Sequence, residues 1–329
     1  MKSSSDLLPR ARVCEAAHEQ YILRFDDGSE SSAVPSGVLR WDAELPAVGD
    51  WVRARRADAD LALIESVEAR RNSISRQRPG GGGEQVLAAN VDLILIVMGL
   101  DGDYNLRRLE RYLVLAASSN AEAIAVLNKR DLCMEWQERL AEVEALTPNA
   151  VALSAQESVE AIRPYAARRT VVLLGSSGAG KSTITNALLG ERRQATLPVR
   201  EHDSRGRHTT TKRMLIDLPE GGALIDTPGL RELALWAGQD SVDEVFAGIA
   251  EIAHQCRFRD CSHSGEPGCA VAEALEAGGL DEARWASYQK LRAEARYHER
   301  EADQRAAAEE KRKWKVIHKA MRHHPKQRF

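Results

Sequence analysis

A glycine-rich segment in the middle of the chain has the spacing of a phosphate-binding loop. Residues 175–182 fit the pattern G-x-x-x-x-G-K-S and follow the apolar run 170–174. In such a loop, backbone N–H groups converge on phosphate oxygens, Lys181 neutralises phosphate charge and Ser182 can reach a magnesium ion. A helix is expected from 181 to 189, with Gly190 as its C-cap. The predicted phosphate contacts are Gly175, Ser176, Ser177, Gly178, Ala179, Gly180, Lys181, Ser182 and Thr183.

A second motif indicates which base is bound. Residues 128–131 read Asn-Lys-Arg-Asp and follow the apolar run 124–127, so they are expected at the carboxyl end of a buried strand, where α/β proteins bind ligands. The Asp131 carboxylate only accepts hydrogen bonds, and guanine offers the N1–H and N2 amino donors that adenine lacks. Lys129 would lay its aliphatic stem over the base. The predicted guanine contacts are Asn128, Lys129, Arg130 and Asp131, with Ser154 and Ala155 at the end of another predicted strand.

Two further segments would complete a site for GTP hydrolysis. Residues 226–229 match D-x-x-G, in which Asp226 would bind magnesium through water and the Gly229 N–H would sense the γ-phosphate. Residues 205–211 are the expected switch segment. Its three threonines are all candidates for the magnesium ligand, and Thr210 is favoured. The predicted magnesium ligands are therefore Ser182, Thr210 and Asp226.

The group that orients the attacking water is harder to assign. Leu230 follows Gly229, whereas many GTPases place a water-orienting glutamine there. Leucine has no hydrogen-bonding group in its side chain, so slow intrinsic hydrolysis is expected. His208 is the candidate, because an imidazole can polarise water near neutral pH, although a lone loop histidine is often only exposed. The predicted catalytic residues are His208, Lys181 and Thr210.

Four potential metal ligands lie within fourteen residues near the C-terminal end. Cys256, Cys261, His263 and Cys269 have the spacing C-x4-C-x-H-x5-C. Three thiolates and one imidazole suit one tetrahedral, structural zinc ion. Disulfides are the competing interpretation, which the histidine and the intracellular GTPase context disfavour.

The order of these motifs is reversed relative to the usual one, because the guanine motif precedes the phosphate loop. Joining the ends of a conventional GTPase domain and cutting it before the strand 91–98 reproduces this order, so the sheet can remain intact. The predicted fold class is therefore an α/β P-loop GTPase domain, circularly permuted, with flanking domains on both sides. Six apolar runs supply its strands: 91–98, 124–127, 150–155, 170–174, 214–218 and 222–226.

Composition and local pattern divide the 329 residues into three predicted domains. Residues 1–72 carry short alternating runs typical of a small β-barrel, and the pattern alone does not separate an OB fold from an SH3-like barrel. Residues 73–237 form the permuted GTPase domain, and the arginine-rich segment 70–83 is interpreted as a basic linker or an RNA contact. Residues 238–329 form a helical zinc-binding domain, whose first helix is expected to open with a capping box at Ser241.

The chain ends in a basic tail. Residues 311–329 hold eight Lys or Arg and no Asp or Glu, with Trp314 among them, which favours contact with an RNA backbone over a merely solubilising tail. The whole-chain net charge is only −3, so nucleic-acid contact would depend on local patches. No apolar run approaches the roughly 18 residues of a membrane span, and the N-terminal residues lack a signal peptide. A cytoplasmic protein without membrane contact is expected.

Together these features resemble the RsgA (YjeQ) family, the GTPases of bacteria that depend on the small ribosomal subunit. The resemblance rests on the permuted order, the N-terminal barrel, Arg-His-Thr-Thr-Thr at 207–211, Asp-Thr-Pro-Gly-Leu at 226–230 and the C-x4-C-x-H-x5-C cluster. It implies an OB-type barrel, GTP or GDP with Mg²⁺ in the middle domain, and one zinc ion. It also implies a switch histidine at His208 and a hydrophobic residue at Leu230. The segment before the barrel is shorter and less basic than in many members.

The family resemblance further implies a function in ribosome assembly. The expected activity is GTP hydrolysis to GDP and phosphate, stimulated by the small ribosomal subunit, during late maturation of that subunit. Its 16S rRNA would be the binding surface, and a monomer is expected. The alternatives are a GTPase of the same architecture serving another RNA or protein, an ATP-dependent kinase, which Asp131 disfavours, and an RNA-binding module with a degenerate nucleotide site.

Overall fold

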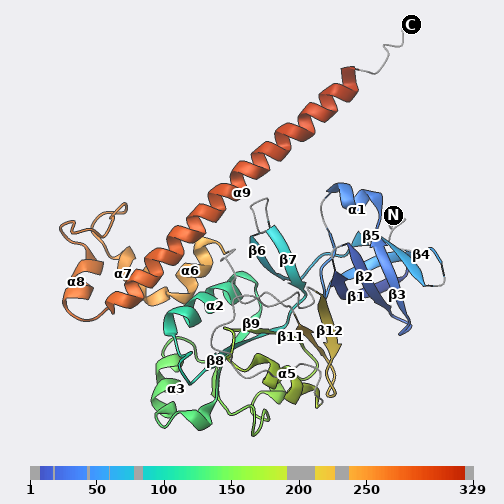
Figure 1. Cartoon of the computed structure of the whole chain (residues 1–329). Helices are drawn as coiled ribbons and strands as arrows, with labels where there is room; N and C mark the ends of the chain where they lie inside the picture. Colours follow the sequence, from blue (N-terminus) through green and yellow to red (C-terminus); the bar gives the residue numbers. More distant parts are fainter. Residues whose placement is uncertain are drawn as a thin grey trace, which may run out of the picture. The chain divides into compact units, whose positions relative to one another are not determined.

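The computed structural model describes residues 8–17, 19–42, 45–58, 60–77, 84–190, 212–226 and 237–322. Two compact units divide the chain, Met1–Ala234 and Leu235–Phe329, and each is described by itself (Figure 1). His208, Thr210 and Gly229, which were predicted to belong to the site, lie outside the described residues.

The first unit begins with a closed barrel, built within the described part of residues 10–67 from five strands and one short helix. The strand order is β1-β2-β3-β5-β4, and β4 pairs back onto β1 and closes the barrel. Burial alternates along the strands, as in the pattern of β3, because one face of each strand is turned to the interior. A five-stranded barrel of this kind is the OB type, and the barrel prediction is confirmed. The elements are β1 (Arg10–Ala17), β2 (Gln20–Phe25), β3 (Glu30–Pro35), α1 (Gly37–Asp42), β4 (Trp51–Arg56) and β5 (Leu61–Val67).

The nucleotide-domain sheet contains the six predicted strands in the part of the chain that the structure describes. In spatial order they are β10 (Ala150–Ala152), β9 (Glu122–Asn128), β8 (Leu93–Gly99), β11 (Thr170–Leu174), β13 (Ala223–Asp226) and β12 (Arg213–Asp217). All neighbours are parallel except β12, which runs antiparallel to β13. Every residue of β8 is buried, as expected for a central parallel strand that is covered on both faces.

Helices complete this domain and its core. They are α2 (Leu106–Ser118), α3 (Trp136–Glu144), α4 (Arg163–Ala166) and α5 (Lys181–Leu189), together with the 3-10 turn η2 (Arg130–Leu132). The helix predicted after the phosphate loop is confirmed, and Gly190 ends it in the left-handed conformation with φ +70°. Ile184 and Leu188 of α5 pack into one apolar cluster with Val97 and Val126 of the sheet, so the loop that precedes α5 is fixed to the sheet.

The strand order explains how distant motifs meet. In a parallel sheet, all strands present their carboxyl ends at the same edge, and ligands bind there. β9, β8, β11 and β13 end at the guanine motif, at Gly99, at the phosphate loop and at Asp226. Since β8 lies between β9 and β11, the residues that follow β8 are placed between the guanine motif and the phosphate loop.

The barrel and the nucleotide domain share a sheet. β1 pairs antiparallel with β12 through Glu15↔Met214 and Ala16↔Arg213, so the strands of the barrel continue those of the nucleotide domain. This connection uses β12, which lies in the chain between the switch segment and the D-x-x-G segment. Pattern analysis did not predict it.

The arginine-rich connector differs from the expected linker. β6 (Ser73–Gln77) pairs with β7 (Glu84–Ala89) as an antiparallel hairpin. Arg70 donates to both carboxylate oxygens of Asp50, at 2.8 and 2.7 Å, and Asp50 is fully buried. A buried carboxylate requires such a partner, so Arg70 has a structural role in the fold.

The second unit is helical in its described residues, with α6 (Gln239–Val245), α7 (Ala247–His254), α8 (Ala270–Glu276) and α9 (Glu282–Arg322). The capping box predicted at Ser241 is wrong, because α6 already begins at Gln239. There the Glu299 carboxylate of α9 accepts hydrogen bonds from the backbone N–H and the side-chain amide of Gln239, at 2.8 and 2.7 Å. A carboxylate at a helix N-terminus satisfies the free N–H groups just as a capping residue would. No helix in the described ranges is both long and apolar enough to cross a membrane.

Candidate functional site

The buried side chain of Asn128 joins three of the predicted motifs. Its Nδ2 donates to the carbonyl of Ala179 in the phosphate loop at 2.9 Å. Its Oδ1 accepts from the backbone N–H of Ala155 at 2.9 Å, and its own carbonyl accepts from the N–H of Leu100 at 2.8 Å. Because Asn128 is only 3% exposed, these hydrogen bonds are shielded from water. The guanine motif, the Ser-Ala segment and the phosphate loop therefore lie side by side.

Two glycines of the phosphate loop stand where no side chain fits. Gly175 has φ +146°, and a Cβ there would lie 2.2 Å from the carbonyl oxygen of Val97 on β8. Gly180 has φ +99°, and a Cβ there would lie 2.0 Å from Nδ2 of Asn128. The spacing of the loop glycines is therefore required by its packing against the neighbouring strands, as well as by access to phosphate.

The charged residue of the loop is held in place at the start of α5. Nζ of Lys181 donates to the carbonyls of Gly175 and Ser176, at 2.8 and 2.5 Å. Ser182 and Thr183 lie in the first turn of α5, where the N-terminal N–H groups and the positive dipole end of a helix favour an anion. The start of α5 therefore places Lys181, Ser182 and Thr183 next to the loop glycines.

The predicted base-binding residues form a compact group at the end of β9. Lys129 adopts the left-handed conformation with φ 65°, which turns the chain directly after the strand. The N–H of Arg130 donates to the carbonyl of Leu153 at 3.1 Å, so this turn is fixed to the segment that carries Ser154 and Ala155. Asp131 lies in η2 and is exposed. A carboxylate there is free to face a purine edge.

Two carboxylates in this region were not predicted. Asp101 and Asp103 lie in the loop between β8 and α2, and Asp101 forms an ion pair with Nζ of Lys129 at 2.5 Å. Asp103 accepts from Oγ of Ser176 at 2.5 Å. Although partial burial raises the pKa of Asp101, the hydrogen bond and positive charge of Lys129 outweigh it and hold that pKa below its usual range. The available signal was an Asp-Gly-Asp sequence directly after a buried strand.

The residues predicted around magnesium are described only in part. Asp226 ends β13, at the same sheet edge as the phosphate loop, and Ser182 lies in the first turn of α5. Thr210 and the other switch residues, including His208, lie outside the described residues, as does Gly229.

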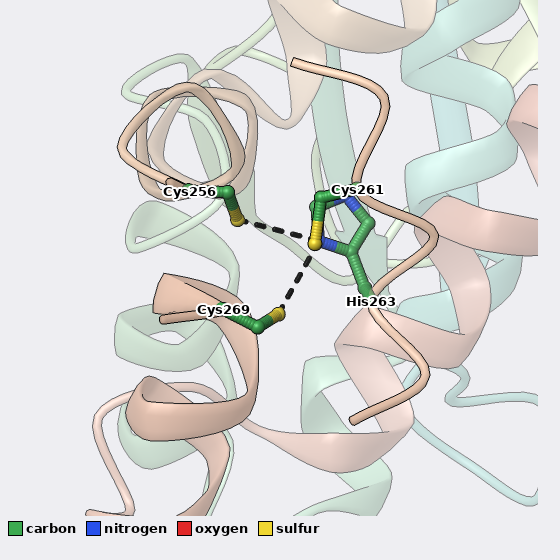
Figure 2. Close-up of side chains that lie close together, drawn as sticks. All are labelled: Cys256, Cys261, His263 and Cys269. Atoms are coloured by element: carbon green, nitrogen blue, oxygen red, sulfur yellow. Dashed lines mark hydrogen bonds between the residues drawn. The ribbon is translucent and has the colours of Figure 1, made fainter. Parts of the chain in front are cut away.

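The four predicted metal ligands come together in the second unit (Figure 2). The ligand atoms of Cys256, Cys261, His263 and Cys269 all lie within 4.8 Å of one another. Nδ1 of His263 is 3.5 Å from the sulfur of Cys256 and 3.6 Å from that of Cys269. All five cysteines of the chain fall in the described ranges and all are free, which contradicts the disulfide alternative.

Local structure holds these ligands in place. Cys269 is the N-cap of α8, and its sulfur accepts from the N–H of Ala272 at 3.4 Å. The Glu266 carboxylate accepts from the N–H groups of Ser262 and Ser264, both at 2.8 Å, and from the Ser262 hydroxyl. These hydrogen bonds, with the largest contribution from the Ser262 hydroxyl, lower the pKa of Glu266 to about 2. The loop between the cysteines is therefore organised by a carboxylate that is charged near neutral pH.

The fold and the motif order define a circularly permuted P-loop GTPase. The family model for RsgA GTPase matches residues 67–236. The chain is 45% identical to the small ribosomal subunit biogenesis GTPase RsgA of Opitutus terrae, over 97% of this chain and 92% of that protein. It is 46% identical to the protein of that name from Xanthomonas campestris, over 86% and 80% of the two chains. The chain therefore belongs to the RsgA GTPase family.

Solved structures agree with this fold. The crystal structure of YjeQ from Thermotoga maritima has a TM-score of 0.65 and 26% identity, covering 87% of this chain and 98% of that one. The crystal structure of YloQ, described as a circularly permuted GTPase, has a TM-score of 0.63 and 22% identity, covering 90% and 98%. The predicted fold class and family are confirmed.

Proposed function

We propose that this chain binds the small ribosomal subunit, assists its late maturation, and hydrolyses GTP to GDP and phosphate with turnover that the subunit stimulates. The observation that carries the nucleotide part is the hydrogen bonding of Asn128 to both the phosphate loop and the Ser-Ala segment. The ribosomal part is supported by the names of the relatives, which are 41–46% identical. The 16S rRNA would be the contact surface, a monomer would act, and the site of action would be the cytoplasm.

The nucleotide would bind across the carboxyl edge of the sheet. The exposed Asp131 carboxylate would accept from the two donors on the guanine edge, and Lys129 would lie along the purine ring. Asn128 would hold the Ser154–Ala155 segment beside the base, because its side chain accepts from the N–H of Ala155 at 2.9 Å. The N–H groups of residues 178–183 would surround the phosphates. Lys181 would exchange its carbonyl partners for phosphate oxygens.

Magnesium and zinc fit the donor sets present. Ser182, Asp226 and Thr210 offer the hard oxygen ligands that Mg²⁺ prefers, and the ion would neutralise charge on the β- and γ-phosphates. The Cys3His cluster offers three soft sulfurs and one imidazole nitrogen within 4.8 Å, the donor chemistry of a closed, structural zinc site. Zinc would hold α7, the intervening loop and α8 together.

Phosphate release tests the proposal. Release from GTP and from ATP is measured for the purified chain alone and with purified small subunits. GTP hydrolysis should be slow alone and rise at least about tenfold with subunits, while ATP should not be hydrolysed. Lys181→Ala, which removes the phosphate-neutralising charge, serves as the inactive control. Equal competition by ATP would instead support a kinase-like nucleotide site, and stimulation by another RNA or protein alone would redirect the assignment.

His208 is proposed to orient the attacking water, since Leu230 has no hydrogen-bonding group. His208→Ala should leave GTP affinity unchanged and lower the subunit-stimulated rate by about 100-fold, a usual contribution of acid–base catalysis. A variant that binds GTP normally and keeps the wild-type stimulated rate would eliminate this role.

A further inference from the structure

The loop after β8 contacts both halves of the nucleotide site. This acidic loop comprises residues 100–105 and connects β8 to α2. Asp101 pairs with Lys129 of the guanine motif, and the N–H of Leu100 donates to the carbonyl of Asn128. Asp103 accepts from the hydroxyl of Ser176 in the phosphate loop. One short segment thus reaches two motifs that are separated by 43 residues of chain, because β8 lies between the strands that carry them.

The pair of Asp101 and Lys129 determines where the lysine side chain points. A free lysine side chain has several rotatable bonds, and fixing them costs up to about 2 kcal/mol of entropy. The carboxylate of Asp101 holds Nζ at 2.5 Å, and the lysine side chain is 22% exposed. The left-handed backbone of Lys129 restricts it further. The stem of Lys129 is therefore ordered before any base arrives.

Two groups outside the phosphate loop hold the carboxylate of Asp103 in place. Its Oδ1 accepts from Arg108 on α2 at 2.5 Å, and its Oδ2 accepts from the N–H of Gly99 at 3.3 Å. Oδ2 also accepts from the Ser176 hydroxyl, and the side chain is only 16% exposed. A carboxylate with fixed partners can hold Ser176, and with it the start of the glycine cradle, in one conformation.

We propose that Asp101 and Asp103 are positioning residues for the nucleotide. Asp101 aligns Lys129 with the guanine ring, and Asp103 aligns the phosphate loop through Ser176. The inference deepens the proposed function and depends on the chain binding guanine nucleotides. The contact of Asp101 with Lys129 exists before the reaction and concerns the base, away from the bond that is cleaved. It should therefore stabilise ground state and transition state equally, which affects nucleotide affinity and leaves kcat unchanged.

Asp101→Asn tests the guanine side. The dissociation constant for fluorescently labelled GDP should rise about fivefold to tenfold, and KM for GTP should rise in parallel. At saturating GTP and small subunits, kcat should stay within about twofold of wild type. In a Lys129→Ala background the Asp101→Asn change should have no further effect, because its partner is gone. Asp101→Glu, which keeps the charge, should recover part of the affinity.

Asp103→Asn and Ser176→Ala test the phosphate side in the same way. Each alone should weaken GDP binding by about threefold to tenfold, and the double variant should be no weaker than the worse single variant. Thermal unfolding without nucleotide separates this role from a folding defect. If Asp103→Asn lowers the melting temperature strongly, Ser176→Ala, which removes only one hydroxyl, carries the test.

Glu122→Gln is the matched control. Glu122 forms an ion pair with Arg169 at 2.6 Å, similarly exposed, but at the opposite end of β9 from Asn128. The Glu122→Gln variant should bind GDP as the wild type does. If wild type itself fails to bind GDP, the proposed function fails. If wild type binds while Asp101→Asn and Asp103→Asn match it, or if the double variants show additive losses, the inference about the acidic loop is overturned.

Discussion

The expected selection of guanine depends on one carboxylate, Asp131. It lies exposed in η2, directly after the turn at Lys129. Asp131→Asn exchanges one of its two acceptor oxygens for an amide donor. Xanthine has a carbonyl at C2 where guanine has an amino group, so the variant should prefer xanthine nucleotides. GDP affinity should fall about 100-fold, equivalent to about 2.7 kcal/mol.

Competition titrations with GDP and xanthosine diphosphate measure this exchange. The substitution concerns only the base edge, so the phosphate loop should still bind either diphosphate once the base is matched. A variant that keeps wild-type preference for GDP would show that another group reads the base. A variant that binds neither would be uninformative unless its thermal unfolding matched wild type, which separates lost recognition from lost folding.

Gly180, the last glycine of the phosphate loop, is a position where the residue type decides whether the site can form. At Gly180 a Cβ would collide with Nδ2 of Asn128 at 2.0 Å, in a backbone with φ +99°. Gly180→Ala should therefore push Asn128 away and break its hydrogen bond to Ala179. GDP affinity should fall by at least about tenfold, since both backbone strain of about 1–3 kcal/mol and a lost contact oppose binding.

Gly190, at the other end of α5, is the control position for Gly180. Gly190 ends α5 with φ +70°, but nothing lies within 4 Å of a Cβ there. Gly190→Ala should lower the melting temperature through strain alone and leave GDP affinity unchanged. Equal GDP affinities for wild type and Gly180→Ala, measured by titration with labelled GDP, would contradict the clash argument.

The residues of the candidate site could be predicted only where the chemistry is encoded locally. The phosphate loop and the guanine motif are short patterns, because neighbouring N–H groups and one carboxylate would perform the binding. Asp101 and Asp103 belong to no such pattern, since their contacts with Lys129 and Ser176 exist only after the sheet has formed. Tertiary structure, rather than spacing, determines what these two carboxylates do.

At the scale of elements, the buried strands were the most predictable part of the fold. β8 and β11 are buried at every position, so their apolar runs are continuous and easy to recognise. β6 was interpreted as part of a linker, because Ser73–Gln77 is polar and precedes a run of glycines. The start of α6 could not be located because Glu299, which satisfies its first N–H, is 60 residues away.

The Cys3His cluster joins α7 to α8, so its metal should support that part of the second unit. Protein purified without added metal should contain one equivalent of zinc by metal analysis. The ring of His263 meets the buried ring of Trp285 edge-on at 5.3 Å. Removing zinc with a chelator should disturb that contact, change tryptophan fluorescence and reduce the helical signal.

Three variants distinguish the effect of losing zinc from a general loss of folding. Cys269→Ser should lose zinc, because it removes one thiolate and a serine hydroxyl is a poor zinc ligand. Cys133→Ser, outside the cluster, should keep the full equivalent. In Trp285→Phe the chelator should still remove zinc but produce little fluorescence change. Absence of zinc from freshly purified wild type would overturn the metal assignment.

At the scale of the whole first unit, side-chain contacts join the barrel to the nucleotide domain in addition to the pairing of β1 with β12. Arg12 of β1 donates from Nη2 to Oγ1 of Thr170 on β11 at 2.7 Å. Burial lowers the pKa of the Arg12 guanidinium, which is consistent with its position inside the junction. Arg24 of β2 forms an ion pair with Asp217 of β12 at 2.7 Å. The first contact joins the barrel to β11, and the second joins it to β12, the strand that lies between the switch segment and the D-x-x-G segment.

Nucleotide binding should therefore stabilise the barrel although the barrel contributes no predicted nucleotide contact. GDP at about 1,000 times its dissociation constant stabilises the folded state by about 4.1 kcal/mol. If β1 and β12 open only together, hydrogen exchange of the slowest amides in β2 should slow about as much as in β8. Arg12→Ala should abolish the protection in β2 and keep it in β8. Arg53→Ala removes an ion pair with Glu68 that lies within the barrel, at 2.8 Å, and should preserve both. Protection confined to β8 in wild type would show that the shared sheet does not couple the two domains.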